Sequence, residues 1–144
     1  HTPRSKRKVQ SEPEGSIETL IGRNPKDRLK MSVLDSGRTA ITSWSIEEEY
    51  TYCALLKLKL GTGRTHQIRV HMEHLGSPVL GDKTYGNFSA LPHNLRLKVN
   101  SFPRQALHAS SLEFTHPVNG KRLKFESSPP SDFLELKQFL ENYQ

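Results

Sequence analysis

The sequence predicts an α+β fold, built mainly as an antiparallel mixed sheet with short helices. Apolar and polar side chains alternate along residues 39–46 and 54–60, which is typical of strands with one buried face. The dipeptide Asn119-Gly120 separates two further apolar segments, and both of its positions tolerate the positive φ angles of a hairpin turn. Helical spacing is confined to two short stretches, at about 66–75 and 131–140. Strands therefore dominate the predicted fold.

The alternation indicates which side chains share a face in each predicted strand. In the first strand these are Ala40, Thr42, Trp44 and Ile46. In the second strand they are Leu56, Leu58 and Leu60, with lysines on the opposite face. A sheet with one buried face requires such a pattern. The pattern alone leaves open whether the Trp44 face belongs to the core or lines a cleft.

Two short helices complete the predicted fold. The first is expected from about His66 to Leu75, with Thr65 as its N-cap and Gly76 just beyond its end. Its apolar stripe has the spacing i, i+4 and i+7 and consists of Ile68, Met72 and Leu75. The second helix is capped by Ser131, and its stripe consists of Phe133, Leu136 and Leu140.

The remaining segments are expected to be irregular. Residues 1–38 are poor in apolar side chains, so we expect a basic, loop-rich connecting segment that precedes residues 39–144. Residues 87–104 are expected to form a loop, because Pro92 and Pro103 oppose continuous pairing. A basic cluster near the start is either a solvated linker or an arm that touches phosphates. It consists of Arg4, Lys6, Arg7 and Lys8.

Composition narrows the classes of function. The 144 residues suffice for one core, and 33% hydrophobic with 25% charged residues describes a polar globular chain. A net charge of +6 suits a polyanion such as RNA or DNA, although many basic proteins bind no nucleic acid. The single cysteine, Cys53, excludes an intrachain disulfide and favours the reducing cytoplasm. No apolar run reaches membrane-spanning length and no signal-peptide pattern opens the chain, so no membrane partner is expected. The start at His1 rather than Met suggests a part of a longer protein.

The most informative stretch lies between residues 58 and 86. Residues 58–71 read LKLGTGRTHQIRVH, and residues 76–86 read GSPVLGDKTYG. They resemble the signature of RluA-type RNA pseudouridine synthases, which is approximately L-x-T-G-R-T-H-Q-I-R-V-H followed by G-x-P-x-x-G-D-x-x-Y-G. Residues 1–38 most resemble the branch of this family that modifies the large ribosomal subunit, synthase D.

The resemblance implies a pseudouridine synthase catalytic-domain fold, with residues 39–144 as its C-terminal part. The family's catalytic aspartate lies in an upstream H-R-L-D-x-x-T-S-G motif, which does not occur in these 144 residues. We therefore expect this chain to be inactive alone and to need the remaining N-terminal part of the same protein as its partner.

The reaction implied by the resemblance defines what the site must provide. Pseudouridine formation breaks the N1–C1′ bond of a uridine and rejoins the base through C5, so we expect no cofactor and no metal. The site needs a carboxylate near C1′ and a pocket for a flipped nucleotide. The resemblance implies that Arg64 pairs with the catalytic aspartate, a role that suits a fixed planar cation.

The resemblance also places Trp44 where the family carries a tyrosine, in the pattern T-x-Y-x-V. We expect the indole to face the cleft and to stack on the target base. An indole cannot replace the tyrosine as a general base, so slow or absent activity would follow if the hydroxyl is needed. A core tryptophan on a half-buried strand is the alternative.

The other polar residues of the signature have two interpretations. His66, Gln67 and Arg69 are expected to contact RNA or to position the Arg64 turn, with the basic cluster adding phosphate contacts. For Gln67 and His71, a buried structural role is equally compatible. A zinc site formed by the histidines at 66, 71 and 74 is disfavoured, because residues 66 and 71 do not share a helical face.

Asp82 is not expected to be the nucleophile. It lies in Gly-Asp-Lys-Thr-Tyr-Gly, where the glycines favour a tight turn and the aspartate can bond its own backbone. Tyr85 is expected to be packed or to anchor this turn.

The sequence therefore predicts the C-terminal part of an RNA pseudouridine synthase that acts on structured RNA, with large-subunit ribosomal RNA as the expected substrate. The alternative is a non-catalytic RNA-binding module that retains the synthase fold.

Overall fold

The computed structural model describes residues 13–115 and 118–143. Its main sheet has four antiparallel strands in the order β2-β1-β3-β4, with bounds Glu14–Arg23 (β1), Met31–Leu34 (β2), Arg38–Glu49 (β3) and Ala54–Leu60 (β4). A separate hairpin consists of β5 (Ser111–Thr115) and β6 (Arg122–Glu126). The helices are α2 (Gln67–His74), α3 (His93–Ser101) and α4 (Ser131–Asn142). The predicted α+β fold, mainly antiparallel sheet with short helices, is confirmed.

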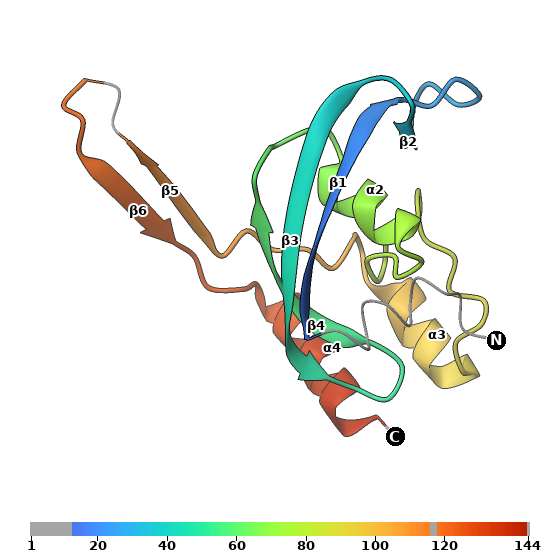
Figure 1. The fold of residues 1–144 in the computed structure, drawn as a ribbon. Coiled ribbons are helices and arrows are strands. Elements are labelled where there is room, and N and C mark those ends of the chain that lie inside the picture. The colour runs from blue at the N-terminus through green and yellow to red at the C-terminus, as the bar shows by residue number, and fades with distance from the viewer. Residues whose placement is uncertain (1–12, 116–117, 144) are drawn as a thin grey trace.

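Figure 1 shows how these elements are arranged. Helix α2 lies against the main sheet, where it contacts β2 and β3. The β5–β6 hairpin extends away from the main sheet as a separate arm. Gly120 has a φ of 70°, but among the described non-glycine residues only His66 has a positive φ, so Asn119 does not. Since β5 ends at Thr115 and β6 begins at Arg122, the predicted hairpin forms with a connection longer than a two-residue turn. No helix in the described part of the chain is long and apolar enough to cross a membrane.

The first core lies between β3 and α2, and it confirms the predicted alternation. Ala40 and Thr42 are fully buried, and Trp44 is 3% exposed. Trp44 packs with the stripe of α2, namely Ile68, Met72 and Leu75, and with Leu56 and Leu58 of β4. The predicted helix stripe is therefore confirmed. Leu60, expected on the same face as Leu56 and Leu58, is 45% exposed, because it stands at the last residue of an edge strand.

The start of α2 differs from the prediction. The N-cap is His66, in the left-handed conformation with a φ of 55°, and no side chain caps the helix. Thr65 is therefore not the cap. The free N–H before the helix is satisfied by Gln67, whose side-chain oxygen accepts from the backbone of Arg64 at 2.9 Å. The end agrees with the prediction, since Gly76 follows the helix with a φ of 76°.

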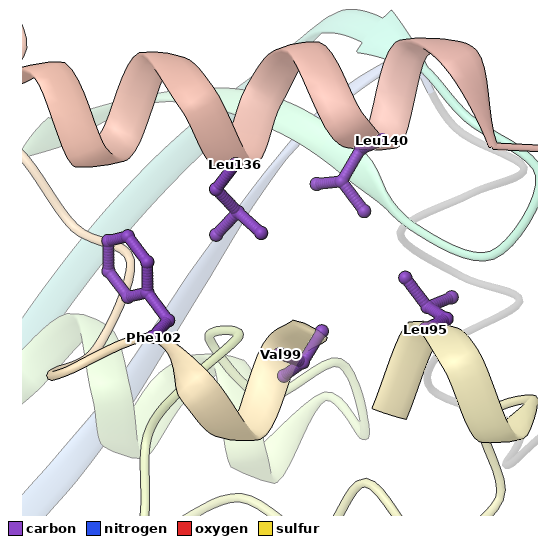
Figure 2. Close-up of a cluster of buried hydrophobic side chains, with 5 residues drawn as sticks. All are labelled: Leu95, Val99, Phe102, Leu136 and Leu140. Atoms are coloured by element: carbon purple, nitrogen blue, oxygen red, sulfur yellow. The ribbon is translucent and has the colours of Figure 1, made fainter. Parts of the chain in front are cut away.

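A second core packs α3 against α4. Figure 2 shows Leu95, Val99 and Phe102 facing Leu136 and Leu140. The expected loop at 87–104 is therefore wrong for residues 93–101. Pro92 precedes the helix as its N-cap, a place where proline is tolerated because its missing N–H is not needed. In α4 the buried residues of the predicted stripe are confirmed, but Pro130 is the N-cap in place of Ser131.

The expectation of a loop-rich segment before residue 39 is corrected for residues 14–38. Residues Glu14 to Ile21 of β1 pair with β3. The segment before residue 39 therefore belongs to the same sheet as the residues after it. Gly15 in β1 is required by packing, because a Cβ at this position would overlap Cζ2 of Trp44. The basic cluster at residues 4–8 lies outside the described residues.

Candidate functional site

The Arg64 turn is held in place by the side chain of Gln67. Oε1 of Gln67 accepts from the backbone N–H of Arg64 at 2.9 Å and from the hydroxyl of Thr62 at 2.7 Å. Nε2 donates to the carbonyl of Ile41 at 2.8 Å and to Oγ1 of Thr42 at 2.9 Å. The two backbone partners fix the orientation of the amide, because a carbonyl can only accept and an N–H can only donate.

This arrangement gives Gln67 a structural role. Its side chain is buried, with 3% exposure, and both ends of the amide are occupied by protein partners. The expected RNA contact does not fit this geometry, whereas the alternative, positioning the Arg64 turn, does. A buried amide with a full set of partners links β3, the turn and the start of α2 as one unit.

Arg64 itself is half-buried, and its Nε donates to the carbonyl of Thr39 at 2.8 Å. Among the side chains that the structure describes, no carboxylate forms an ion pair with it. The backbone and one guanidinium nitrogen are therefore fixed, while the two terminal nitrogens have no ion-pair partner in the described part of the chain. An arginine held in this way can receive a carboxylate or a phosphate.

The network continues from Thr42 to a buried histidine. His71 is fully buried, with Nδ1 at 2.7 Å from Oγ1 of Thr42 and Nε2 at 2.8 Å from Oγ1 of Thr19. Thr42 already accepts from Gln67, so its own hydroxyl hydrogen is available to Nδ1. Thr42 is fully buried, whereas Thr19 is half-buried and its hydroxyl can reach water. Placing the imidazole proton on Nε2, where it donates to Thr19, therefore gives the buried hydroxyl hydrogen of Thr42 an acceptor. Burial lowers the pKa of His71, and the nearby His74 lowers it further.

A second buried group ties α2 to the loop that follows it. Nε and one terminal nitrogen of Arg69 donate to the two carboxylate oxygens of Asp82, at 2.8 and 2.9 Å. The same carboxylate accepts from the backbone N–H groups of Thr84 and Tyr85. Burial alone would raise the pKa of Asp82, but the Arg69 guanidinium and the two N–H groups hold that pKa below its usual value.

These contacts agree with a structural Asp82, which is 1% exposed and shapes its own turn as expected. They also give Arg69 an internal partner, since its guanidinium lies over the ring of Tyr85 at 5.0 Å as well as against Asp82. RNA contact by Arg69 stays a prediction. Only the terminal guanidinium nitrogen that does not donate to Asp82 is available for such a contact.

Tyr85 anchors the loop to β2 and to His66. Its hydroxyl accepts from the backbone N–H of Met31 at 2.9 Å and lies 2.8 Å from Nδ1 of His66. The hydroxyl oxygen of Tyr85 therefore joins the backbone of β2 to the imidazole of His66. Burial lowers the pKa of His66, and Arg69 lowers it further. His66 is half-buried, and its expected RNA contact stays a prediction.

The expected position of Trp44 in the cleft is wrong in this structure. The indole is 3% exposed and belongs to the core between the sheet and α2. The physical reason is that α2 covers the face of β3 on which Trp44 lies. The alternation predicted that face correctly, but the face belongs to the core and not to a cleft. The indole N–H has no hydrogen-bond partner in the described part of the chain.

The sequence reasoning missed the threonines that complete the network, Thr19, Thr42 and Thr62. Thr42 carried a signal through its place in the alternation of β3, and Thr62 through its place in the signature, whereas Thr19 carried none. The described residues contain no cluster of three or more side chains suited to a metal ion, and both ring nitrogens of His71 face threonine hydroxyls. The four basic residues at 4–8 expected to contact phosphates lie outside the described residues.

Comparison with known proteins agrees with this geometry. The sequence profile of the family described as RNA pseudouridylate synthase matches residues 5–74. The ribosomal large subunit pseudouridine synthases D of Xanthomonas campestris pv. campestris and Pseudomonas aeruginosa are each 45% identical over 130 residues, or 88% of this chain. The chain spans 39% and 41% of these relatives, about two fifths of their length.

A solved structure supports the fold. The human RNA pseudouridylate synthase domain containing 4 matches with a TM-score of 0.69 over 90% of this chain and 57% of that one, at 23% identity. The signature at residues 58–86 contains two hydrogen-bonded groups, one around Arg64 and Gln67 and one around Arg69 and Asp82. Together with the profile match and the relatives, it shows that the chain belongs to the RluA-type family of RNA pseudouridine synthases.

Proposed function

We propose that this chain is the C-terminal part of the catalytic domain of an enzyme that converts uridine to pseudouridine in structured RNA. In this proposal residues 39–144 are the C-terminal part of that domain. Residues 1–38 are a connecting segment of the same domain, in which β1 and β2 pair into the sheet of β3. The observation that carries the proposal is the Arg64 turn. Its backbone is bonded by the buried amide of Gln67 and its guanidinium by the carbonyl of Thr39, which leaves two terminal nitrogens for a carboxylate.

The proposed chemistry assigns one task to Arg64. A carboxylate bonds to C1′ of the sugar as the N1–C1′ bond breaks. The base then turns, and C5 forms the new bond to C1′ while the carboxylate–C1′ bond breaks, which regenerates the carboxylate. The hydrogen on C5 leaves to solvent and N1 gains a proton, so atoms balance without an oxidant or an energy donor. Removed from water, a lone carboxylate would tend to protonate. A guanidinium beside it keeps its charge and its direction, and the carboxylate itself comes from the N-terminal part of the same protein.

We propose large-subunit ribosomal RNA as the substrate. The relatives that cover most of this chain are named as ribosomal large subunit pseudouridine synthases, and a net charge of +6 favours a polyanion. Such a substrate places the protein in the cytoplasm, which the single cysteine also favours.

The test measures tritium released from RNA that carries [5-³H]uridine, because only loss of the C5 hydrogen frees the label. The protein from the complete reading frame should release tritium and the 144-residue chain alone should not. In the complete protein, Arg64→Lys should lose most activity, since a point charge replaces a planar fork. Arg28→Lys, at an exposed turn position, is the matched control and should keep it.

A second candidate function is an RNA-binding module that retains the fold without catalysis. It is favoured by one observation, that no described carboxylate pairs with Arg64. The same assay separates the two functions. RNA binding without tritium release by the complete protein would establish the module, and tritium release by the 144-residue chain would overturn the need for an N-terminal part.

A further inference from the structure

A polar depression lies beside the loop at residues 81–89, and Arg64 and Gln67 are not among its lining residues. It is bounded by the loop at residues 81–89 and by α3, and its volume is about 450 Å³, within the range of roughly 300–1,000 Å³ that is typical of small-molecule sites. The side chains that bear on its chemistry are Lys83, Asn87, Phe88, Ser89, Arg96 and Asn100.

The charges around the depression favour an anion. Lys83 and Arg96 are its two cations, and Asp82 is its one acid. That acid does not offset them, because its carboxylate is buried and already bonded to Arg69 and two backbone N–H groups. A phosphate entering the depression would therefore meet two uncompensated positive charges.

The remaining lining residues offer amide and aromatic groups, which could contact a part of the ligand other than its phosphate. The amides of Asn87 and Asn100 can donate and accept hydrogen bonds. Phe88 supplies a half-buried aromatic ring. Cations beside an aromatic ring and neutral amides form the combination with which proteins hold the phosphate and the base of an unpaired nucleotide.

The walls of the depression are fixed by contacts within the chain. The guanidinium of Arg96 donates to the carbonyl of Ser89 at 3.3 Å and lies 3.2 Å from Nδ1 of His93. Within the loop, a Cβ on Gly86 would lie 2.5 Å from Cζ of Phe88, so the ring packs directly on the glycine. A site that is formed before the ligand arrives loses less free energy to ordering.

We propose that this depression is a subsite for one unpaired nucleotide of the RNA substrate. Lys83 and Arg96 hold the phosphate, and Phe88 and Asn100 contact the base. The proposal rests on the proposed function, since it assumes an RNA substrate, and it deepens that function by placing a nucleotide contact between the end of the signature and α3, apart from Arg64.

The experiment follows ¹⁵N-labelled 144-residue chain by NMR while a short single-stranded oligouridylate is added. Amide signals of residues 83–89 and 96–100 should shift in one saturable process. Inorganic phosphate and a short polyglutamate are added in parallel as probes of charge alone, and they should shift these signals only weakly at the same concentration.

Two pairs of variants test the site without altering the core. Lys83→Gln should lower the slope of log affinity against log salt by ~0.7, the value of one single-strand phosphate contact. Lys98→Gln is its control, because Lys98 is on the same helix as Arg96 but lies over the ring of Phe139. Asn100→Asp should weaken binding roughly fivefold by placing a negative charge in the site, and Asn94→Asp, exposed on α3 outside the depression, should not.

The outcomes separate this subsite from the function on which it rests. If the oligouridylate binds but shifts other signals, or if Lys83→Gln and Lys98→Gln behave alike, the subsite is wrong and RNA binding stands. If phosphate or polyglutamate shifts the same signals equally, the depression is a general anion surface and the proposal is overturned. If the protein from the complete reading frame binds no RNA at any salt concentration, the proposed RNA substrate fails together with the subsite.

Discussion

Two arginine–aspartate pairs of the same geometry stabilise two regions of this protein at different depths. In each pair, two guanidinium nitrogens donate to the two carboxylate oxygens. The side chains of Arg69 and Asp82 are 14% and 0% exposed, whereas those of Arg104 and Asp132 are 40% and 39% exposed. Both guanidinium groups also lie over an aromatic ring.

The difference in burial decides what each pair does. Asp82 has no access to water, and every contact that keeps it charged comes from the protein: Arg69 and the N–H groups of Thr84 and Tyr85. Removing one partner leaves a buried charge without compensation. Asp132 remains solvated, so water can replace its arginine. The buried pair therefore holds the signature loop against α2, and the exposed pair only tethers the start of α4.

The largest effect is expected from Asp82→Asn. This change keeps the shape of the side chain but leaves the guanidinium of Arg69 buried without its counter-charge. We expect the free energy of unfolding to fall by about 3–5 kcal/mol, measured by urea denaturation of the 144-residue chain. A change below about 1 kcal/mol would mean that the pair is not desolvated in solution.

The next effect is expected from Gln67→Leu. It removes an amide with two donors and two acceptor contacts, and leaves the N–H of Arg64 and the carbonyl of Ile41 without that partner. We expect a loss of about 2–4 kcal/mol, because buried polar groups then lack hydrogen bonds.

Activity of the complete protein extends the test of Gln67. Gln67→Leu should lower kcat for tritium release at a temperature where the variant is still folded, because the Arg64 turn is no longer fixed. An unchanged kcat would show that Gln67 stabilises the fold without positioning Arg64.

A smaller effect, dependent on pH, is expected from His71. Burial lowers the pKa of the folded-state imidazole, while an unfolded histidine titrates near about 6.5. Below that pH the histidine is protonated in the unfolded chain but stays neutral in the folded chain. The free energy of unfolding therefore falls as the pH falls. The slope is at most about 1.4 kcal/mol per pH unit for one such histidine.

Urea denaturation between pH 7.5 and 5 measures this slope. His71→Gln should lower the slope without abolishing it, because the lowered pKa of His66 contributes a slope of the same sign. His93→Gln, at an exposed position, is the control variant. A wild-type stability that stays constant down to pH 5 would contradict a neutral buried His71. Asp82 does not confuse the result, because its lowered pKa moves its own titration to more acidic pH.

The same contrast between local and distant partners explains what the sequence could predict. β3, β4 and the stripe of α2 were predictable because alternation and helical spacing are local consequences of one buried face. β1 was missed because its partner is β3, and its glycine at position 15 is set by Trp44 across the sheet. α3 was missed because a short helix between prolines shows little periodicity before Leu95 and Val99 are seen to face α4.

At the candidate site the sequence identified the residues but not their directions. Arg64, Gln67 and Asp82 were recognised from the signature. Whether Gln67 faces RNA or the interior depends on Ile41 and Thr42, about 25 residues away in the sequence, and no local pattern contains that information. Trp44 illustrates the limit, since the alternation gave its face and only the position of α2 made that face the core.

The smallest effect is expected from Asp132→Asn, the same chemical change as Asp82→Asn at the exposed pair. Arg104 lowers the pKa of Asp132 and the N–H of Phe133 lowers it further, with burial opposing them, but the carboxylate and its arginine both remain in contact with water. We expect the urea midpoint of Asp132→Asn to match that of the unaltered chain within error. Raising the salt concentration should shift the two midpoints by the same amount. If Asp132→Asn instead loses as much stability as Asp82→Asn, burial does not distinguish the two pairs, and the bidentate geometry that they share would have to carry the stability of both.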